Sequence, residues 1–183
     1  MATNSSYLEG STVLVTGPMA AGKSTIARAL AATFVKGVHV EGDVFRRFIV
    51  SGRHEMTPEP SEEALAQLRL RYRLTAEVAE QYARTGYTVV VEDVVAGPLL
   101  VEFVSLFTHR PLHLVVLLPD EEAIVEREAD RRALGYDNWT VSGLHRVFSE
   151  ETERLGLWLD TSADTPEKTV REIRSRAAES ALR

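Results

Sequence analysis

The sequence predicts an α/β fold in which helices cover both faces of a parallel β-sheet. Runs that favour strands alternate along the chain with runs that favour helices, and strands separated by helices pair in parallel with right-handed crossovers. The second, third and fourth strand runs show little apolar–polar alternation, as expected when both sheet faces are buried. A glycine-rich segment, Gly17–Ser24, joins the first strand run to the first helical run.

The expected strands are short apolar runs that end in polar residues. The first is Val13-Leu14-Val15-Thr16, the third is a triple valine followed by Glu92, and the fourth contains His113, for which we expect a buried core position. The predicted strands are Thr12–Thr16, Val38–Glu41, Thr88–Glu92, Leu112–Leu118 and Leu157–Leu159.

The helices are expected where helix-favouring runs carry residues typical of helix ends. Ser61 precedes two glutamates, which suits the positive end of a helix dipole, and Gly86 suits the end of the same helix. Thr165 is a suitable N-cap, and Pro166 fits a first helical turn. The predicted helices are Ser24–Phe34, Val44–Ser51, Glu62–Arg84, Gly97–Phe107, Glu121–Leu134, Val141–Arg154 and Glu167–Ala181.

Length and composition indicate one soluble globular domain over residues 1–183, with 44% hydrophobic and 26% charged residues. The net charge of −6 makes a nucleic-acid partner unlikely, because duplex binding relies on cationic side chains. The absence of cysteine excludes disulfides, thiolate metal sites and thiol nucleophiles. Met1–Gly10 lacks the features of a secretory signal, and no apolar run approaches the ~20 residues needed to span a bilayer. We therefore expect a cytoplasmic enzyme with no membrane partner.

Gly17–Ser24 reads Gly-Pro-Met-Ala-Ala-Gly-Lys-Ser, the pattern of a phosphate-binding loop between a strand and a helix. The glycines allow the backbone to approach a phosphate closely, so that loop N–H groups and the helix N-terminus face the anion. Lys23 is predicted to act in catalysis at the β- and γ-phosphates, and the Ser24 hydroxyl to hold Mg²⁺. The predicted cofactors are therefore ATP and Mg²⁺. The predicted nucleotide-binding residues here are Gly17, Pro18, Met19, Ala20, Ala21, Gly22, Lys23, Ser24 and Thr25.

Acidic residues follow the next two predicted strands, at the sheet edge where ligands of parallel sheets bind. Asp43 is predicted to bind the acceptor and orient its hydroxyl for attack, or to act as a base, although an N-cap role is also open. Arg46 and Arg47 follow about one helical turn later and are predicted to line the same pocket. Asp93, with Glu92 as the substitute, is predicted to bind substrate and lie near Mg²⁺, the alternative being a solvated acidic strand end.

Arg127 and Arg131 share a helix face after the fourth strand and are predicted to stabilise the transferring phosphoryl group. The segment after them could cover the site, so the predicted helical lid spans about residues 127–143. The alternative is a solvated helix on which these arginines pair with nearby acids. Thr161 and Ser162 follow the fifth strand and are predicted, with Arg127, to border the nucleotide base.

Residues 44–85 lie between the second and third strands and are predicted to form the acceptor pocket. Arginines make this segment locally basic, which suggests a small-molecule acceptor with an anionic group bound by Arg46 and a second arginine. The alternative is that Arg69, Arg71 and Arg73 face solvent and pair with glutamates.

These motifs resemble those of the small P-loop kinases of the nucleoside-monophosphate-kinase-like group, which include chloramphenicol phosphotransferase and the adenylylsulfate, gluconate and shikimate kinases. Gly42-Asp43-Val44-Phe45-Arg46 is similar to the Gly-Asp-x-x-Arg of adenylylsulfate kinase, where Glu41 replaces a further aspartate. The Arg127-x-x-x-Arg131 pair resembles the lid arginines of the group. The resemblance implies a three-layer P-loop NTPase fold, a five-stranded parallel sheet of order 2-3-1-4-5 and a lid.

The resemblance also implies MgATP-dependent phosphorylation of a small-molecule hydroxyl, on a metabolite or an antibiotic. A nucleoside, nucleotide or polynucleotide 5′-hydroxyl kinase is the second enzymatic interpretation. A regulatory module that binds ATP without transfer is the third interpretation, and a carboxylate facing the γ-phosphate, as predicted for Asp43, favours a kinase over it. The sequence leaves the acceptor and the oligomeric state open.

Overall fold

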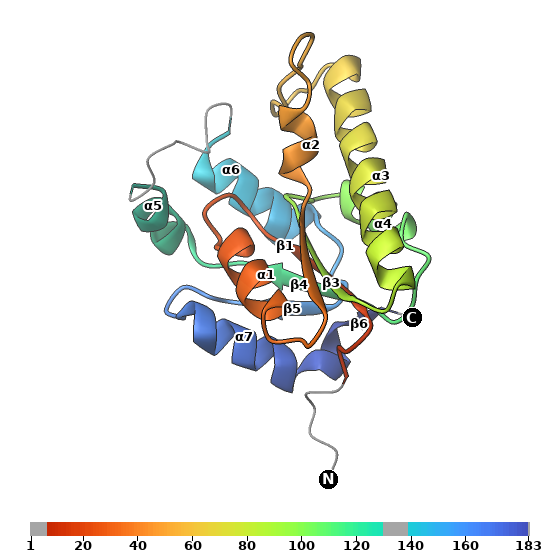
Figure 1. Cartoon of the computed structure of the whole chain (residues 1–183). Coiled ribbons are helices and arrows are strands. Elements are labelled where there is room, and N and C mark those ends of the chain that lie inside the picture. The colour runs from red at the N-terminus through yellow and green to blue at the C-terminus, as the bar shows by residue number, and fades with distance from the viewer. Residues whose placement is uncertain (1–6, 130–138, 183) are drawn as a thin grey trace.

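A parallel β-sheet with helices on both faces forms the body of the protein (Figure 1). The computed structural model describes residues 7–129 and 139–182. The main strands are β1 (Thr12–Thr16), β2 (Gly37–Glu41), β3 (Thr88–Glu92), β4 (Leu112–Leu117) and β5 (Leu157–Leu159). They lie in the order β2-β3-β1-β4-β5, and each neighbouring pair is parallel. The predicted fold class and strand order are confirmed.

The two faces of the sheet bury alternate residues of the same strands. Val13, Val15 and Val90 pack against α1 (Lys23–Ala31) and α7 (Pro166–Ser175). Leu14 and Val91 pack on the opposite side, against α3 (Glu62–Arg84), α4 (Leu99–Ser105) and α6 (Val141–Arg146). Because both faces are covered by helices, the strands are apolar on both sides, which explains the weak alternation in the sequence.

Two further helices follow strands at the edge of the sheet where the sequence predicts the site. They are α2 (Asp43–Arg47), which follows β2, and α5 (Glu121–Ala129), which follows β4. The predicted extension of α5 to Leu134 lies outside the described residues. Within residues 7–129 and 139–182, no helix combines the length and apolar character needed to cross a membrane.

The last predicted helix, Glu167–Ala181, is too long. The helix α7 ends at Ser175, a 3₁₀ turn covers Ala177–Ser180, and Ala181–Leu182 form β6, which pairs antiparallel with β4. His113 of β4 is buried as expected, and its Nδ1 lies 2.9 Å from the Ser180 hydroxyl. This long-range contact and the strand pairing stabilise the turn in place of a further helical turn.

Four other helices are shorter than predicted: α1 ends at Ala31, α4 spans Leu99–Ser105, and larger differences occur after β2 and before β5. The helix after β2 was expected over Val44–Ser51, but α2 ends at Arg47, because Phe48 and Val50 are exposed and bury no face that would support another turn. The helix expected over Val141–Arg154 changes after Arg146 into a π-helical turn, Val147–Glu151. There the Thr152 hydroxyl donates to the Val147 carbonyl at 2.7 Å and ends the helix.

Glu80, near the C-terminal end of α3, holds the loop between α4 and β4. Its buried carboxylate accepts hydrogen bonds from the Thr108 N–H (2.8 Å), the Thr108 hydroxyl (2.8 Å) and the His109 N–H (2.7 Å). Burial alone would raise the pKa of Glu80, but these hydrogen bonds lower it below its ordinary value. The carboxylate therefore fixes this end of α3 to the sheet.

We predict that Glu80→Ala lowers the free energy of unfolding by about 2–4 kcal/mol, because buried N–H groups lose a charged acceptor. Urea denaturation followed by tryptophan fluorescence measures the change. Glu77→Ala is the matched control, since Glu77 is exposed on the same helix and should change stability by less than about 0.5 kcal/mol. Equal losses in the two variants would contradict the assignment.

Candidate active site

The phosphate-binding loop, residues 17–24, joins β1 to α1 and has backbone angles that favour glycine. Gly22 has φ of 90°, and Ala20 also has a positive φ, 61°, which is rare for a residue with a side chain. A Cβ on Gly17 would lie 2.2 Å from the Leu117 carbonyl oxygen, so β4 packs directly against the loop. The sequence therefore folds this loop tightly against the end of the sheet.

The N-terminus of α1 presents backbone N–H groups and no acidic side chain. Gly22 is its N-cap and provides no side-chain hydrogen bond, and the first turn lacks aspartate and glutamate. The Lys23 side chain is buried, and its Nζ donates to the Pro18 carbonyl at 2.9 Å, within the curve of the loop. This arrangement suits a polyphosphate, because the backbone dipoles and the ammonium group concentrate positive charge there.

The Ser24 hydroxyl donates a 2.8 Å hydrogen bond to Glu92 Oε1 at the end of β3. The sequence predicts Asp93, with Glu92 as the substitute, as the carboxylate near Mg²⁺. The structure brings Glu92 to Ser24. Adjacent residues of a strand point in opposite directions, so only one of the two can face the loop. A hydroxyl and a carboxylate beside a phosphate site are oxygen donors of the kind that Mg²⁺ prefers, so the residues fit this ion.

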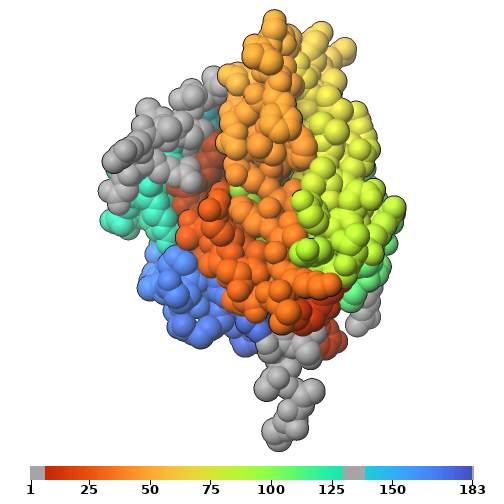
Figure 2. Space-filling view, viewed as in Figure 1, coloured from red at the N-terminus to blue at the C-terminus, as the bar shows by residue number. Residues whose placement is uncertain are grey.

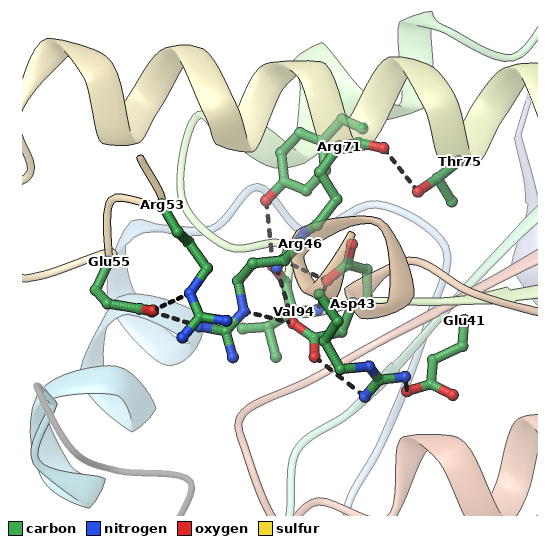
Figure 3. Close-up of polar contacts among 11 residues, drawn as sticks. Glu41, Asp43, Arg46, Arg53, Glu55, Arg71, Thr75 and Val94 are labelled. Carbon is green, nitrogen blue, oxygen red and sulfur yellow. Dashed lines mark hydrogen bonds and ion pairs between the residues drawn. The ribbon is translucent and has the colours of Figure 1, made fainter. Parts of the chain in front are cut away.

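Asp93 instead pairs with Arg71 of α3. Arg71 Nη2 lies 2.6 Å from Asp93 Oδ1, and Arg71 Nη1 lies 3.1 Å from Asp43 Oδ1, so one guanidinium group bridges two carboxylates (Figure 3). Burial raises the pKa of Asp93 to about 6, although Arg71 and the Val94 N–H act against this rise. Burial alone would lower the pKa of Arg71, but the two carboxylates raise it.

Asp43 lies in the first turn of α2 and contacts three arginines. Besides Arg71, Arg46 Nε lies 3.2 Å from Asp43 Oδ1, and Arg47 Nη1 lies 3.5 Å from Oδ2. Its side chain forms no N-cap hydrogen bond, because the N-cap residue of α2 is Gly42. The N-cap alternative for Asp43 is therefore wrong, and its carboxylate is oriented by guanidinium groups from two helices.

Close packing around Asp93 fixes this arrangement. A Cβ on Gly42 would lie 2.2 Å from Asp93 Oδ2, so only glycine lets β2 and the Asp93 side chain approach so closely. The Thr16 hydroxyl bonds both the N–H and the carbonyl of Val95 at 2.9 Å, and the Tyr72 hydroxyl donates to the Val94 carbonyl at 3.1 Å. The loop after β3 is thereby tied to β1 and to α3.

Arg71 is the site residue that sequence reasoning missed. It was considered only among arginines that face solvent, and its side chain is in fact 12% exposed. A signal was available in the helical spacing, because Arg71 follows the buried Leu68 by three residues and precedes the buried Thr75 by four. An arginine on the buried stripe of a helix needs a carboxylate partner, and two lie within reach.

Several other arginines of the basic segment also pair with carboxylates. Arg46 and Arg53 both contact Glu55, Arg53 Nε at 2.8 Å from Oε1 (Figure 3). Further out, Arg47 Nη2 lies 3.0 Å from Glu41 Oε1. On α3, Arg69 Nε lies 2.8 Å from Glu102 Oε1, so its partner is a residue of α4 rather than the glutamates expected from the sequence.

Arg127, Thr161 and Ser162, each predicted to bind the nucleotide, lie together in the structure. Arg127 Nη2 donates to the carbonyls of Thr161 (2.6 Å) and Ser162 (3.1 Å), which ties α5 to the loop after β5. The side-chain hydroxyls of the same loop have other surroundings. The Ser162 hydroxyl donates to the Asp160 carboxylate, and Thr161 Oγ1 is buried. Arg131 and most of the predicted lid lie outside the described residues.

A cleft of about 1430 Å³ connects the phosphate-binding loop with the acceptor region. Met19, Lys23 and Ser24 line one end, and α2, the segment 48–61, α3 and α6 line the rest. Asp43, Arg46, Arg47, Glu92 and Asp93 all belong to its wall. In Figure 2 the α2 region and the start of α3 project beyond the body of the molecule.

Among the described residues, no group of three or more histidine, cysteine, aspartate or glutamate side chains could hold a metal ion alone. A divalent ion at Ser24 and Glu92 would therefore depend on phosphate oxygens and water for its remaining ligands. This is the usual arrangement for Mg²⁺ in proteins that bind nucleoside triphosphates.

The phosphate-binding loop and the sheet order together define a P-loop nucleotide-binding domain. A family model described as AAA domain matches residues 13–147, and the chain belongs to this family. A search of curated proteins gives no significant match.

Several similar solved structures are kinases. A sugar kinase from Janibacter has 18% identity and a TM-score of 0.68, covering 92% of this chain and 94% of that chain. A Mycobacterium tuberculosis APS kinase in complex with AMPPNP and APS has 18% identity and a TM-score of 0.62, covering 90% and 95%. A Bacteroides thetaiotaomicron shikimate kinase has 14% identity and a TM-score of 0.60, covering 91% and 98%. These likenesses concern the fold.

We predict that Asp93 makes stability depend on pH between about 4 and 6. Its pKa is about 6 in the folded protein and 3.8 ordinarily, so in this window the folded state holds a proton that the unfolded state releases. Its contribution to the free energy of unfolding therefore falls as pH rises through the window, by at most about 3 kcal/mol.

The measurement compares urea denaturation of the wild type and Asp93→Asn at pH 4, 5, 6 and 7. The stability of the wild type relative to the variant should decline from pH 4 to 6 and then level off. Parallel profiles across this range would show that Asp93 is ionised throughout.

Proposed function

We propose that this protein transfers the γ-phosphoryl group of ATP to the hydroxyl of a small-molecule acceptor. The observation that carries the proposal is the position of Asp43, which lines the same cleft as Lys23 and Ser24 and lies at the start of the acceptor region. A carboxylate between a phosphate-binding loop and an open pocket has no evident use in a module that only binds nucleotide. The fold shared with small kinases supports the same conclusion.

The donor half of the proposed site consists of the phosphate-binding loop, Glu92 and Arg127. Backbone N–H groups of residues 17–24 and Lys23 bind the β- and γ-phosphates and stabilise the charge that spreads over the transferring group. Ser24 and Glu92 would hold Mg²⁺, which when bound neutralises phosphate charge and orients the phosphates. Arg127, held by the Thr161 and Ser162 carbonyls, would border the nucleotide next to the loop after β5.

The acceptor half consists of Asp43 and the arginines that orient it. Asp43 accepts a hydrogen bond from the acceptor hydroxyl and directs its oxygen toward the γ-phosphorus. A bond forms between that oxygen and phosphorus, the bond to the β–γ bridging oxygen breaks, and ADP leaves while the hydroxyl proton passes to Asp43 or water. Because this transition state is loose, orientation matters more than proton abstraction. Arg71 is a positioning residue that holds Asp43 relative to Asp93.

Acceptor-dependent ADP release over a panel of small alcohols tests the proposal, with products identified by mass spectrometry. Transfer to at least one alcohol is the expected result. ATP binding with no transfer to any alcohol would instead favour a regulatory module.

We predict that Asp43→Asn lowers kcat about a hundredfold or more while the Kd for ATP stays unchanged, because the amide orients the hydroxyl poorly and does not touch the phosphate-binding loop. Steady-state kinetics and nucleotide titration measure the two effects. Glu102→Gln is the control, since Glu102 pairs with Arg69 at the surface and should leave kcat within about threefold.

Arg71→Lys separates positioning from binding in the same assay. Lysine cannot span both carboxylates as the planar guanidinium does, so kcat should fall while the KM for ATP is retained. A wild-type kcat in either Asp43→Asn or Arg71→Lys would contradict the assigned roles.

We predict that Glu92→Gln and Ser24→Ala each raise the Mg²⁺ concentration for half-maximal activity about tenfold or more, because the first removes the negative charge that attracts the ion and the second removes the hydroxyl oxygen. ATP binding in EDTA should be nearly unaffected by Glu92→Gln, which separates metal binding from nucleotide binding. An unchanged Mg²⁺ requirement in Glu92→Gln would instead make Asp93 the candidate carboxylate for binding the ion.

A further inference from the structure

We propose that the acceptor is an uncharged, amphiphilic alcohol whose hydroxyl is carried by a bulky apolar body. This inference rests on the kinase function proposed above and names the substrate class of that same site. It follows from three features of the cleft beyond Asp43: its apolar wall, the internal use of its polar groups, and the neutralisation of its arginines.

The apolar wall extends from the polar end of the cleft into the acceptor region. Leu68 and Tyr72 of α3 and Leu144 of α6 line it and are buried members of the core, and Met56 and Trp139 are partly buried against them. The parts of these apolar side chains that face the cleft favour a ligand with an apolar body, because such a body removes the remaining apolar surface from water.

Three polar side chains along this part of the cleft already have hydrogen-bond partners within the chain. The Tyr72 hydroxyl donates to Val94, and the Gln67 amide donates to the Gly52 carbonyl at 2.8 Å and accepts from the His54 N–H at 3.0 Å. The Thr57 hydroxyl donates to the Glu59 carbonyl at 2.8 Å. A polyhydroxylated acceptor needs one protein partner for each buried hydroxyl, and here those partners are engaged elsewhere.

The three arginines of α2 and α3 that line the cleft are likewise paired with carboxylates that line it too. Arg71 pairs with Asp43 and Asp93, Arg46 with Asp43 and Glu55, and Arg47 with Glu41 and Asp43. An acceptor carboxylate or phosphate would have to displace one of these partners and would face the others. The predicted anionic acceptor is therefore disfavoured on electrostatic grounds; within residues 7–129 and 139–182, Arg146 of α6 is the remaining arginine that lines the cleft.

These features orient the acceptor. Its hydroxyl lies at the Asp43 end, next to Ser24 and Lys23, and its apolar body lies along Met56, Leu68 and Trp139. The cleft volume of about 1430 Å³ exceeds the few hundred Å³ typical of small-ligand pockets. It has room for a body well beyond the size of a single sugar ring beside the triphosphate.

The test compares kcat/KM for primary alcohols of four classes: an arylalkyl diol, a neutral hexose, an anionic sugar acid and a 5′-hydroxyl oligonucleotide. We expect the arylalkyl diol to exceed the other classes about tenfold or more. A preference for the hexose, the sugar acid or the oligonucleotide would overturn the inference while leaving the kinase function intact. ATP binding without transfer to any class would contradict the kinase function and the inference with it.

A pair of variants then locates the apolar body. Met56→Gln replaces a cleft side chain by a polar one of similar shape and should raise the KM for the arylalkyl diol about tenfold without changing the KM for ATP. Val50→Gln is the matched control, because Val50 is fully exposed in the same segment and outside the cleft wall. An unchanged KM in Met56→Gln, or equal changes in the two variants, would show that the apolar wall does not bind the acceptor.

Discussion

The ion pair between Arg71 and Asp93 is the interaction on which the arrangement of the site depends. It joins the buried stripe of α3 to the carboxyl end of β3, and through Asp43 it extends to the start of α2. A buried ion pair contributes little to net stability, but breaking it leaves an unpaired charge in the interior. The ion pair matters here because of the geometry that it fixes. The Arg71 guanidinium group holds together α3, the start of α2 and the end of β3, which are distant from one another in the sequence.

Much of the fold followed from local patterns in the sequence, and what was missed depended on long-range contacts. The apolar runs of β1, β3 and β4 and the phosphate-binding loop are short-range signals, so their positions were predicted closely. By contrast, β6 is two residues long and exists through its pairing with β4, and the end of α2 is decided by the lack of a burial surface beyond Arg47. A short stretch of sequence reveals neither feature, because both depend on how distant parts of the chain pack.

The candidate site shows the same division. Asp43, Lys23, Ser24 and Arg127 were chosen because they follow strands or belong to a motif, and the structure places the first three around one cleft. The choice between Glu92 and Asp93 depended on which neighbour faces the loop, which is a question of strand orientation. In the sequence Arg71 lies between the exposed Arg69 and Arg73. Its distinct role depends on its position around the helix, which turns its side chain toward the site.

The helix α3 is fixed in two places, by Arg71 at the cleft and by Glu80 at the loop before β4. Residues 48–61, which precede it, form no helix or strand and supply much of the acceptor wall. The groups proposed to transfer phosphate thus stand on fixed elements, while one part of the surface proposed to select the acceptor, which includes Met56, lies on a segment that can be exchanged. Exchange of that segment offers a route to new acceptor preferences in laboratory evolution, without redesign of the groups that handle ATP.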